Sequence, residues 1–124
     1  PIGEWLPAEP LVDAMMSMGD TDYIYLSQGS AGIIVLDARD PENLAEVGAW
    51  QVQATYGLTV LDGMLYVGVE DGVAVLDLTD PTTPAEIGAE PIAVSGNPHR
   101  IWLDSGFGYS IDLVDGLLTI FNAE

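Results

Sequence analysis

The stretch GIIVLDARDPENLAEVG, residues 32–48, recurs as GVAVLDLTDPTTPAEIG at residues 72–88. The two copies lie 40 residues apart at both ends, from Gly32 to Gly72 and from Gly48 to Gly88. Internal similarity at such a period indicates a repeat architecture, in which each unit buries its faces against its neighbours. We therefore expect one supersecondary unit to be repeated along the chain.

Turn residues divide the middle copy into short segments. Asp62-Gly63 and Asp80-Pro81 are turn dipeptides, because glycine tolerates positive φ and proline fixes its own φ while removing a backbone donor. The segments between the turns predict four hairpin-linked strands, at residues 57–61, 64–69, 72–78 and 85–90. The third of these is apolar on both faces, which in an antiparallel sheet is typical of stacked sheets. We expect an all-β fold, with four-stranded antiparallel blades packed face to face as in a β-propeller.

The unit continues on both sides of the two strong copies. Residues 107–122 form a weaker third copy, in which Phe121 stands where the other copies end a strand with Asp37 and Asp77. The opening residues PIGEW resemble EVGAW at residues 46–50, the fourth strand of the first copy. These matches predict a single domain over residues 1–124, with blades at about 11–51, 55–90 and 98–122 and with the strand at residues 2–6 closing the last blade of this or another copy.

These motifs resemble those of a known family. The pattern Tyr-x-Tyr at residues 23–25, then Gly-Ile-Ile-Val-Leu-Asp, Asp-Pro and Val-Gly, is similar to the LVIVD repeat of bacterial and archaeal β-propeller proteins. The resemblance covers nearly the whole chain and is closest over residues 23–90. It implies a propeller that is exported or displayed on a surface, and it implies no catalytic residues.

The predicted blades leave two strands to be paired. Propellers typically have four to eight blades, so three are too few to close a ring. An exposed apolar edge strand is an aggregation template, and a strand from another copy would cover it. The expected partner is the chain itself, as a homodimeric six-bladed ring or as a head-to-tail fibre. The residues predicted to make this contact are Ile2, Trp5, Leu6, Leu117, Leu118, Ile120 and Phe121.

The charge balance is strongly acidic. Twenty acidic residues oppose Arg39 and Arg100, with no lysine, which gives a formal net charge of -18. Nucleic-acid binding needs clusters of lysine or arginine and is excluded as a function. No apolar run approaches the roughly 20 residues that span a bilayer, so membrane insertion is not expected. Together with the resemblance, the composition favours an extracellular or cell-surface location; the alternative is the cytoplasm of a salt-adapted organism.

Calcium is the one cofactor that the acidic turns suggest. Hard cations prefer several oxygen ligands, and the candidate ligands lie in two turns, Asp20 with Asp22 and Asp112 with Asp115. Neither turn has the spacing of an EF-hand loop. Aspartates in turns also cap the local backbone. This second interpretation applies to Asp40 and Asp80 as well, which we expect to cap the turns that lead from the third strand to the fourth.

Catalytic signals are weak, and no catalytic residue is predicted. His99 is the only histidine and no cysteine is present, so neither a zinc site nor a cysteine nucleophile is expected within one chain. A nucleophile elbow is also absent from the sequence. His99, Arg100 and Trp102 fall near the start of an inner strand and are the candidate ligand-binding residues. The sequence therefore leaves two functions open. The chain is either a non-catalytic scaffold acting through acidic propeller surfaces, or a fragment of a propeller hydrolase or lactonase with a metal or a site at the channel mouth.

Overall fold

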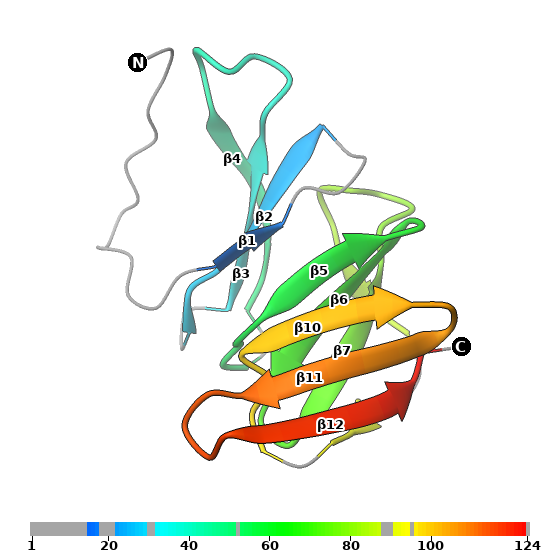
Figure 1. Ribbon diagram of the computed structural model, residues 1–124. Helices are drawn as coiled ribbons and strands as arrows, with labels where there is room; N and C mark the ends of the chain where they lie inside the picture. Colours follow the sequence, from blue (N-terminus) through cyan, green and yellow to red (C-terminus); the bar gives the residue numbers. More distant parts are fainter. Residues whose placement is uncertain are drawn as a thin grey trace.

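The computed structural model describes residues 15–17, 22–29, 32–51, 53–87, 91–94 and 96–123, which form β-strands joined by turns and loops (Figure 1). Every strand pair is antiparallel. The prediction of an all-β, antiparallel fold is therefore confirmed. The described residues contain no helix long and apolar enough to cross a membrane.

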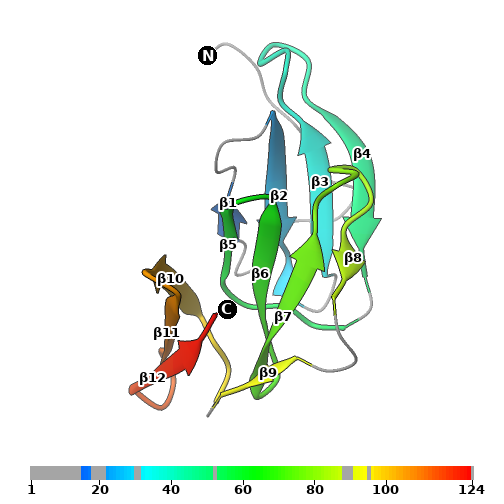
Figure 2. The same ribbon diagram turned by 90° about the vertical axis from the view of Figure 1, so that its right-hand side faces the viewer.

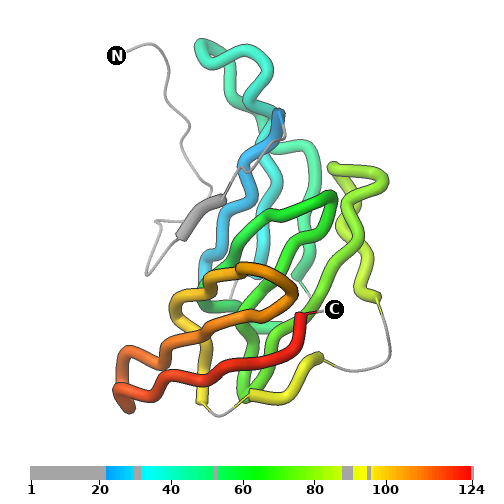
Figure 3. Tube along the Cα trace, turned by 45° about the vertical axis from the view of Figure 1, so that its right-hand side comes forward, coloured from blue at the N-terminus to red at the C-terminus, as the bar shows by residue number. Residues whose placement is uncertain are grey.

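Three sheets follow one another along the chain. Sheet A has the order β1 (Met15–Ser17), β2 (Tyr23–Ser27), β3 (Ile33–Asp37) and β4 (Ala45–Trp50). Sheet B has the order β5 (Leu58–Leu61), β6 (Met64–Val69), β7 (Gly72–Asp77) and β8 (Ala85–Glu86), and β9 (Ile92–Ala93) also pairs with β7. Sheet C has the order β10 (Arg100–Asp104), β11 (Phe107–Asp112) and β12 (Leu117–Asn122). Each sheet is a meander, and the tube in Figure 3 follows this path from one sheet to the next.

The hairpin turns are formed by the residues that the sequence indicates. Asp62 and Gly63 both have positive φ, at 51° and 75°, and join β5 to β6. Ser105 and Gly106, at 53° and 83°, join β10 to β11 in the same way. Two consecutive residues with positive φ match the right-handed twist of the flanking strands, which explains why glycine takes the second place.

The register of the third hairpin corrects the sequence alignment. Asn122 in β12 lies opposite Phe107, just as Asp77 in β7 lies opposite Met64. Asn122 therefore occupies the place of the strand-ending aspartate, which the sequence comparison assigned to Phe121. The reason is a longer turn, because residues 113–116 separate β11 from β12 whereas residues 70–71 separate β6 from β7.

An equivalent backbone hydrogen bond in each sheet supports this register. In all three sheets the residue after the hairpin donates its N–H to the carbonyl of the residue before it. The bonds are Ala38 to Asp22 at 2.8 Å, Leu78 to Gly63 at 3.0 Å and Ala123 to Gly106 at 2.9 Å. The three hairpins are thus closed in the same way despite their different turns.

Each sheet has one face that carries a tyrosine, which we call its tyrosine face. Tyr25, Tyr66 and Tyr109 lie at equivalent positions in β2, β6 and β11, and the alternate residues of the same strands form the back face. The tyrosine face of sheet A packs on the back face of sheet B in the larger core, which contains Tyr25, Ile33, Val35, Leu65, Val67 and Leu76. The tyrosine face of sheet B packs on the back face of sheet C in the smaller core, which contains Tyr66, Val73, Leu103 and Phe121. Figure 1 shows sheet C in front of sheet B, and Figure 2 shows the three sheets from the side.

Aspartate caps the turns that leave the third strands, as predicted. Asp80 Oδ1 accepts hydrogen bonds from the backbone N–H of Thr82 at 3.1 Å and from its hydroxyl at 2.9 Å. Asp40 Oδ1 accepts from the N–H of Glu42 at 3.0 Å, and Asp40 Oδ2 accepts from the side-chain amide of Asn43 at 2.9 Å. Both carboxylates therefore cap the local backbone.

Candidate functional site

The side chain of His99 is fixed on two sides. The backbone N–H of Leu113 donates a hydrogen bond of 3.0 Å to His99 Nδ1, and the ring of Tyr56 meets the imidazole edge-on at 5.3 Å. Because Nδ1 accepts this bond, the proton of the neutral ring lies on Nε2. A histidine that acts as a general base in a triad has the opposite arrangement, with Nδ1–H donating to a carboxylate.

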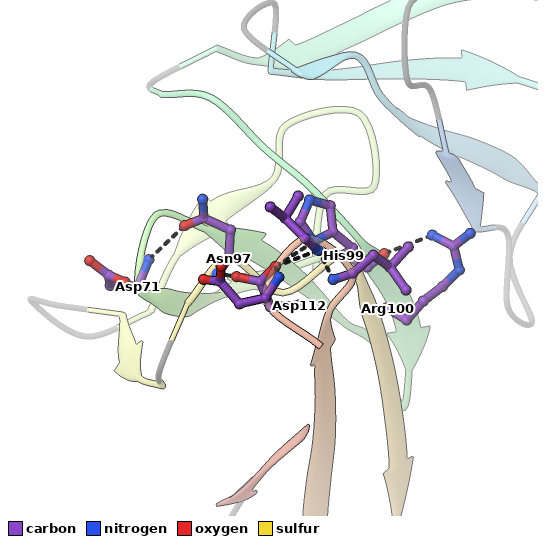
Figure 4. Close-up of polar contacts among 8 residues, drawn as sticks. Asp71, Asn97, His99, Arg100 and Asp112 are labelled. Atoms are coloured by element: carbon purple, nitrogen blue, oxygen red, sulfur yellow. Dashed lines mark hydrogen bonds and ion pairs between the residues drawn. The ribbon is translucent and has the colours of Figure 1, made fainter. Parts of the chain in front are cut away.

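Asp112 is the hub of the polar cluster around His99 (Figure 4). Its Oδ2 accepts the N–H of Asn97 at 3.0 Å, and its Oδ1 accepts the N–H groups of Val114 at 2.8 Å and Asp115 at 3.1 Å. These backbone donors, the one on Asn97 first, hold the pKa of the Asp112 carboxyl below its usual value. His99 Nδ1, which accepts the N–H of Leu113, also lies 3.6 Å from Asp112 Oδ1.

The same cluster ties sheet B to sheet C. Asn97 Oδ1 accepts the N–H of Asp71, in the β6–β7 turn, at 3.2 Å (Figure 4). The approach of Asp112 requires glycine at position 96, because a Cβ there would collide with the Asp112 carboxylate and the φ is +79°. The polar groups of this cluster are therefore engaged in holding three loops together.

The predicted metal ligands that the structure describes, Asp22, Asp112 and Asp115, do not form a metal-binding group. Among the residues that the structure describes, no group of three or more histidine or acidic side chains is arranged to hold a metal ion. The carboxylate of Asp112 caps its turn through three N–H groups, and Asp115 contributes one of these donors. Asp22 takes part in closing its hairpin through its carbonyl oxygen, and Asp20 lies outside the described residues.

The three predicted ligand-binding residues do not line one pocket. Arg100 Nη1 donates to the carbonyl of His99 at 3.0 Å, next to it in the chain. Trp102 is 72% exposed and lines an open pocket of about 160 Å³, together with Thr59, Val60, Leu61 and Leu103. Neither His99 nor Arg100 lines this pocket, although Arg100 and Trp102 share one face of β10, so His99 is not part of the surface that the other two share.

The residues predicted for assembly differ in exposure. On β12, Leu118 and Ile120 are 59% and 62% exposed and Leu117 is exposed as well. Phe121, which was expected beside them, is instead buried. Its ring packs directly on Gly108, where there is no room for a Cβ. Ile2, Trp5 and Leu6 lie outside the described residues.

The tyrosine face of sheet C is an exposed apolar surface. Cross-strand partners align Trp102, Tyr109 and Ile120 in one row and Arg100, Ile111 and Leu118 in the next, with Phe107 beyond them. All six of its large apolar or aromatic side chains except the half-buried Tyr109 are exposed: Trp102, Phe107, Ile111, Leu118 and Ile120. Contiguous patches of this kind mark interaction surfaces in folded proteins.

Part of this surface was missed in the sequence. Phe107 and Ile111 were read only as members of a weak third copy. The alternation Phe107-x-Tyr109-x-Ile111 was the available signal, since alternate strand residues share a face. Comparison with known proteins adds no assignment, because no protein-family model matches the chain and no curated protein is similar to it.

Proposed function

We propose that the chain is a β-propeller unit of the LVIVD type and acts as a non-catalytic scaffold, which binds further copies of itself or another protein through its propeller surfaces. The observation that carries the proposal is the exposed tyrosine face of sheet C. The equivalent faces of sheets A and B are each covered by the next sheet. A unit of this kind is suited to continue its stack with another blade.

The arrangement of the sheets supports a propeller. Propeller blades are meanders that pack face to face, with their first strands around a centre. Here β5 lies next to both β1 and β10, so the first strands of the three sheets are neighbours. Close backbone approaches join the sheets at this level, as in the 2.8 Å hydrogen bond from the N–H of Gly57 to the carbonyl of Pro98.

The polar cluster supports a non-catalytic role. His99 has its Nδ1 bonded to a backbone N–H, and Asp112 accepts three backbone N–H groups. Both side chains serve loop structure rather than a reacting group. The hydrolase or lactonase alternative needs a metal or free reacting groups at the channel mouth, and because His99 and Asp112 are both engaged with the backbone, it is the weaker proposal.

A surface or extracellular location is part of the proposal. Its support is the composition, with 20 acidic residues and no lysine, which keeps a protein soluble and repels nucleic acid and anionic lipid. We further propose that residues 2–6 supply a fourth strand beside β12 of another copy, because their sequence repeats that of β4. The product is a closed six-bladed ring of two chains or a head-to-tail fibre.

Deletion of residues 1–6 tests the scaffold proposal. Electron microscopy of the full chain is expected to show rings or fibres, and the deletion variant is expected to give monomers or irregular aggregates. A full chain that stays a stable monomer contradicts the self-assembly proposal. Elemental analysis after dialysis tests the alternative function. A stoichiometric, tightly held divalent metal would favour the hydrolase or lactonase over the scaffold.

A further inference from the structure

The junction between sheets A and B shows how one blade recognises the next. Tyr25 is completely buried, and its hydroxyl donates a hydrogen bond of 2.8 Å to the carbonyl of Pro81. Pro81 belongs to the Asp80-Pro81 turn of sheet B, which the Asp80 carboxylate caps. The contact thus joins the tyrosine face of one sheet to the Asp-Pro turn of the next.

Both halves of this contact occur again without a counterpart in the described chain. Tyr109 of sheet C is the equivalent of Tyr25, and the apolar side chains around it are exposed. Pro41 of sheet A is the equivalent of Pro81 and is exposed in its turn, whereas Pro81 is partly covered. Sheet A therefore has an exposed Asp-Pro turn, and sheet C has the equivalent tyrosine.

We propose that the tyrosine face of sheet C binds sheet A of a second copy, with the Tyr109 hydroxyl donating to the carbonyl of Pro41 in that copy. This inference rests on the proposed self-assembly and names its interface. The partner surface is the back face of sheet A, whose side chains include Ile24, Leu26, Ile34 and Leu36. Leu65, Val67 and Leu76 form the equivalent back face of sheet B and already receive a tyrosine face within the chain.

Charge favours this surface as the point of contact. Two copies that each carry a formal charge of -18 repel each other, and the repulsion is weakest where acidic side chains are few. The tyrosine face of sheet C contains Asp104 as its one acidic residue and also one of the two arginines, Arg100. A ring of two chains contains two such junctions, so each needs to supply only about half of the roughly 1,600 Å² of a standard interface.

Binding at sheet A requires that the contacts burying its back face within one chain be replaced. Leu26, Ile34 and Leu36 are 7%, 7% and 3% exposed in the single chain, so a second copy must replace what covers them there. Contacts that bury these side chains within one chain would be replaced by contacts with sheet C of the other copy, so binding requires a local rearrangement. We therefore expect association to be slow and to depend on protein concentration.

Sedimentation velocity of full-length variants tests the surface. Ile120→Asp introduces a charge in the centre of the tyrosine face and is expected to weaken association at least tenfold, since a buried unpaired charge is strongly unfavourable. Val114→Asp makes the same change at a side chain that is 83% exposed in the β11–β12 turn, and association should stay within about twofold of wild type. Tyr109→Phe removes one hydroxyl and is expected to weaken association about three- to tenfold. Circular dichroism of each variant verifies that it is folded.

Photo-cross-linking identifies the partner surface. Tyr109 is replaced by p-azidophenylalanine, which places the reactive azide where the hydroxyl stood, and unlabelled and 15N-labelled chains are mixed. The expected product links residue 109 of one copy to the turn at residues 38–44 of a copy with the other label. A link to sheet C of another copy, or to the same chain, overturns the proposed interface.

The outcomes separate this inference from the proposed function. A wild-type chain that remains monomeric contradicts both. A chain that associates, but whose association is unaffected by Ile120→Asp, contradicts only the interface proposed in this subsection. A folded Ile120→Asp monomer beside an associating Val114→Asp variant, with the expected cross-link, supports both.

Discussion

The hydroxyl of Tyr25 in sheet A donates a 2.8 Å hydrogen bond to the carbonyl of Pro81 in sheet B, 56 residues further along the chain. The tyrosine is fully buried, so the bond satisfies a polar group inside the larger core. The residue before Pro81 is the aspartate that caps the turn, so turn geometry and sheet stacking depend on each other. The relationship gives the first prediction.

Tyr25→Phe is expected to lower the free energy of unfolding by about 0.5–1.5 kcal/mol, because Pro81 loses a buried partner. Urea denaturation measures the change. Tyr109→Phe is the matched control at a protein concentration where the chain is monomeric, since Tyr109 has no hydroxyl hydrogen bond to another described residue. Equal losses in the two variants would contradict the assigned role of the Tyr25 hydroxyl.

The Tyr25 variant should also change the alkaline limit of stability. Burial raises the pKa of Tyr25 to about 12 from an ordinary value of 10.0. The stabilisation of its protonated form is complete below about pH 10 and is lost as pH rises through about 12, because the unfolded chain ionises first. If the free energies of unfolding of the wild type and of Tyr25→Phe change in parallel between about pH 10 and 12, the assigned pKa of Tyr25 is contradicted.

Asp80→Ala should lower the melting temperature by a few degrees, because the N–H of Thr82 loses its acceptor. Asp80→Asn keeps an acceptor oxygen and is expected to lose less. Glu86→Ala, at an exposed acidic residue of β8, is the control for the change in charge. If Asp80→Ala and Glu86→Ala have the same melting temperature, the cap contributes nothing to stability.

Stability should fall steeply in acid. Hydrogen bonds lower the pKa of Asp37 through Arg39, of Asp77 through Thr79 and of Asp80 through Thr82. A lowered folded-state pKa means that the stabilisation is complete above the unfolded value of about 4 and is lost as pH falls through the folded values. Relief of the repulsion among 20 acidic residues acts in the opposite direction between neutral pH and about pH 4. We expect a stability maximum near pH 4–5 in urea titrations, and a maximum at neutral pH would contradict this balance.

Asp112→Asn tests whether the polar cluster has a structural role. An amide can face the three backbone donors with one oxygen only, so its NH2 group must lie against an N–H. We expect a lower melting temperature and faster hydrogen exchange at Asn97 or at Val114. A variant that melts like the wild type would mean that these bonds do not stabilise the loops.

The first three strands and the turns of the middle unit follow from its sequence, whereas the strand predicted at residues 85–90 is found only at Ala85–Glu86 (β8) in the part of the chain that the structure describes. Residues 64–69 were predicted as a strand and are β6, and the aspartate caps were predicted from Asp-Pro alone. Local signals suffice there because turn chemistry and strand alternation act between near neighbours. Asn122 was misaligned because a longer turn shifted the offset of the third copy, which only the strand pairing reveals.

The candidate surface depends on longer-range information. Alternation shows that Trp102 and Asp104 share a face, but it does not say which face of a sheet is covered by the next one. That choice is made by packing between sheets, as the burial of Phe121 against sheet B illustrates. Sequence alone therefore gave the exposed Leu118 and the buried Phe121 the same role.

The central claim is that copies of this chain assemble through an apolar face, and sedimentation velocity of the full chain over a range of protein and NaCl concentrations tests it most directly. Salt screens the repulsion between acidic copies and strengthens apolar association. The predicted result is a dimer or a larger assembly whose fraction rises with protein concentration and with NaCl. A single monomeric species at every concentration and salt would contradict the claim.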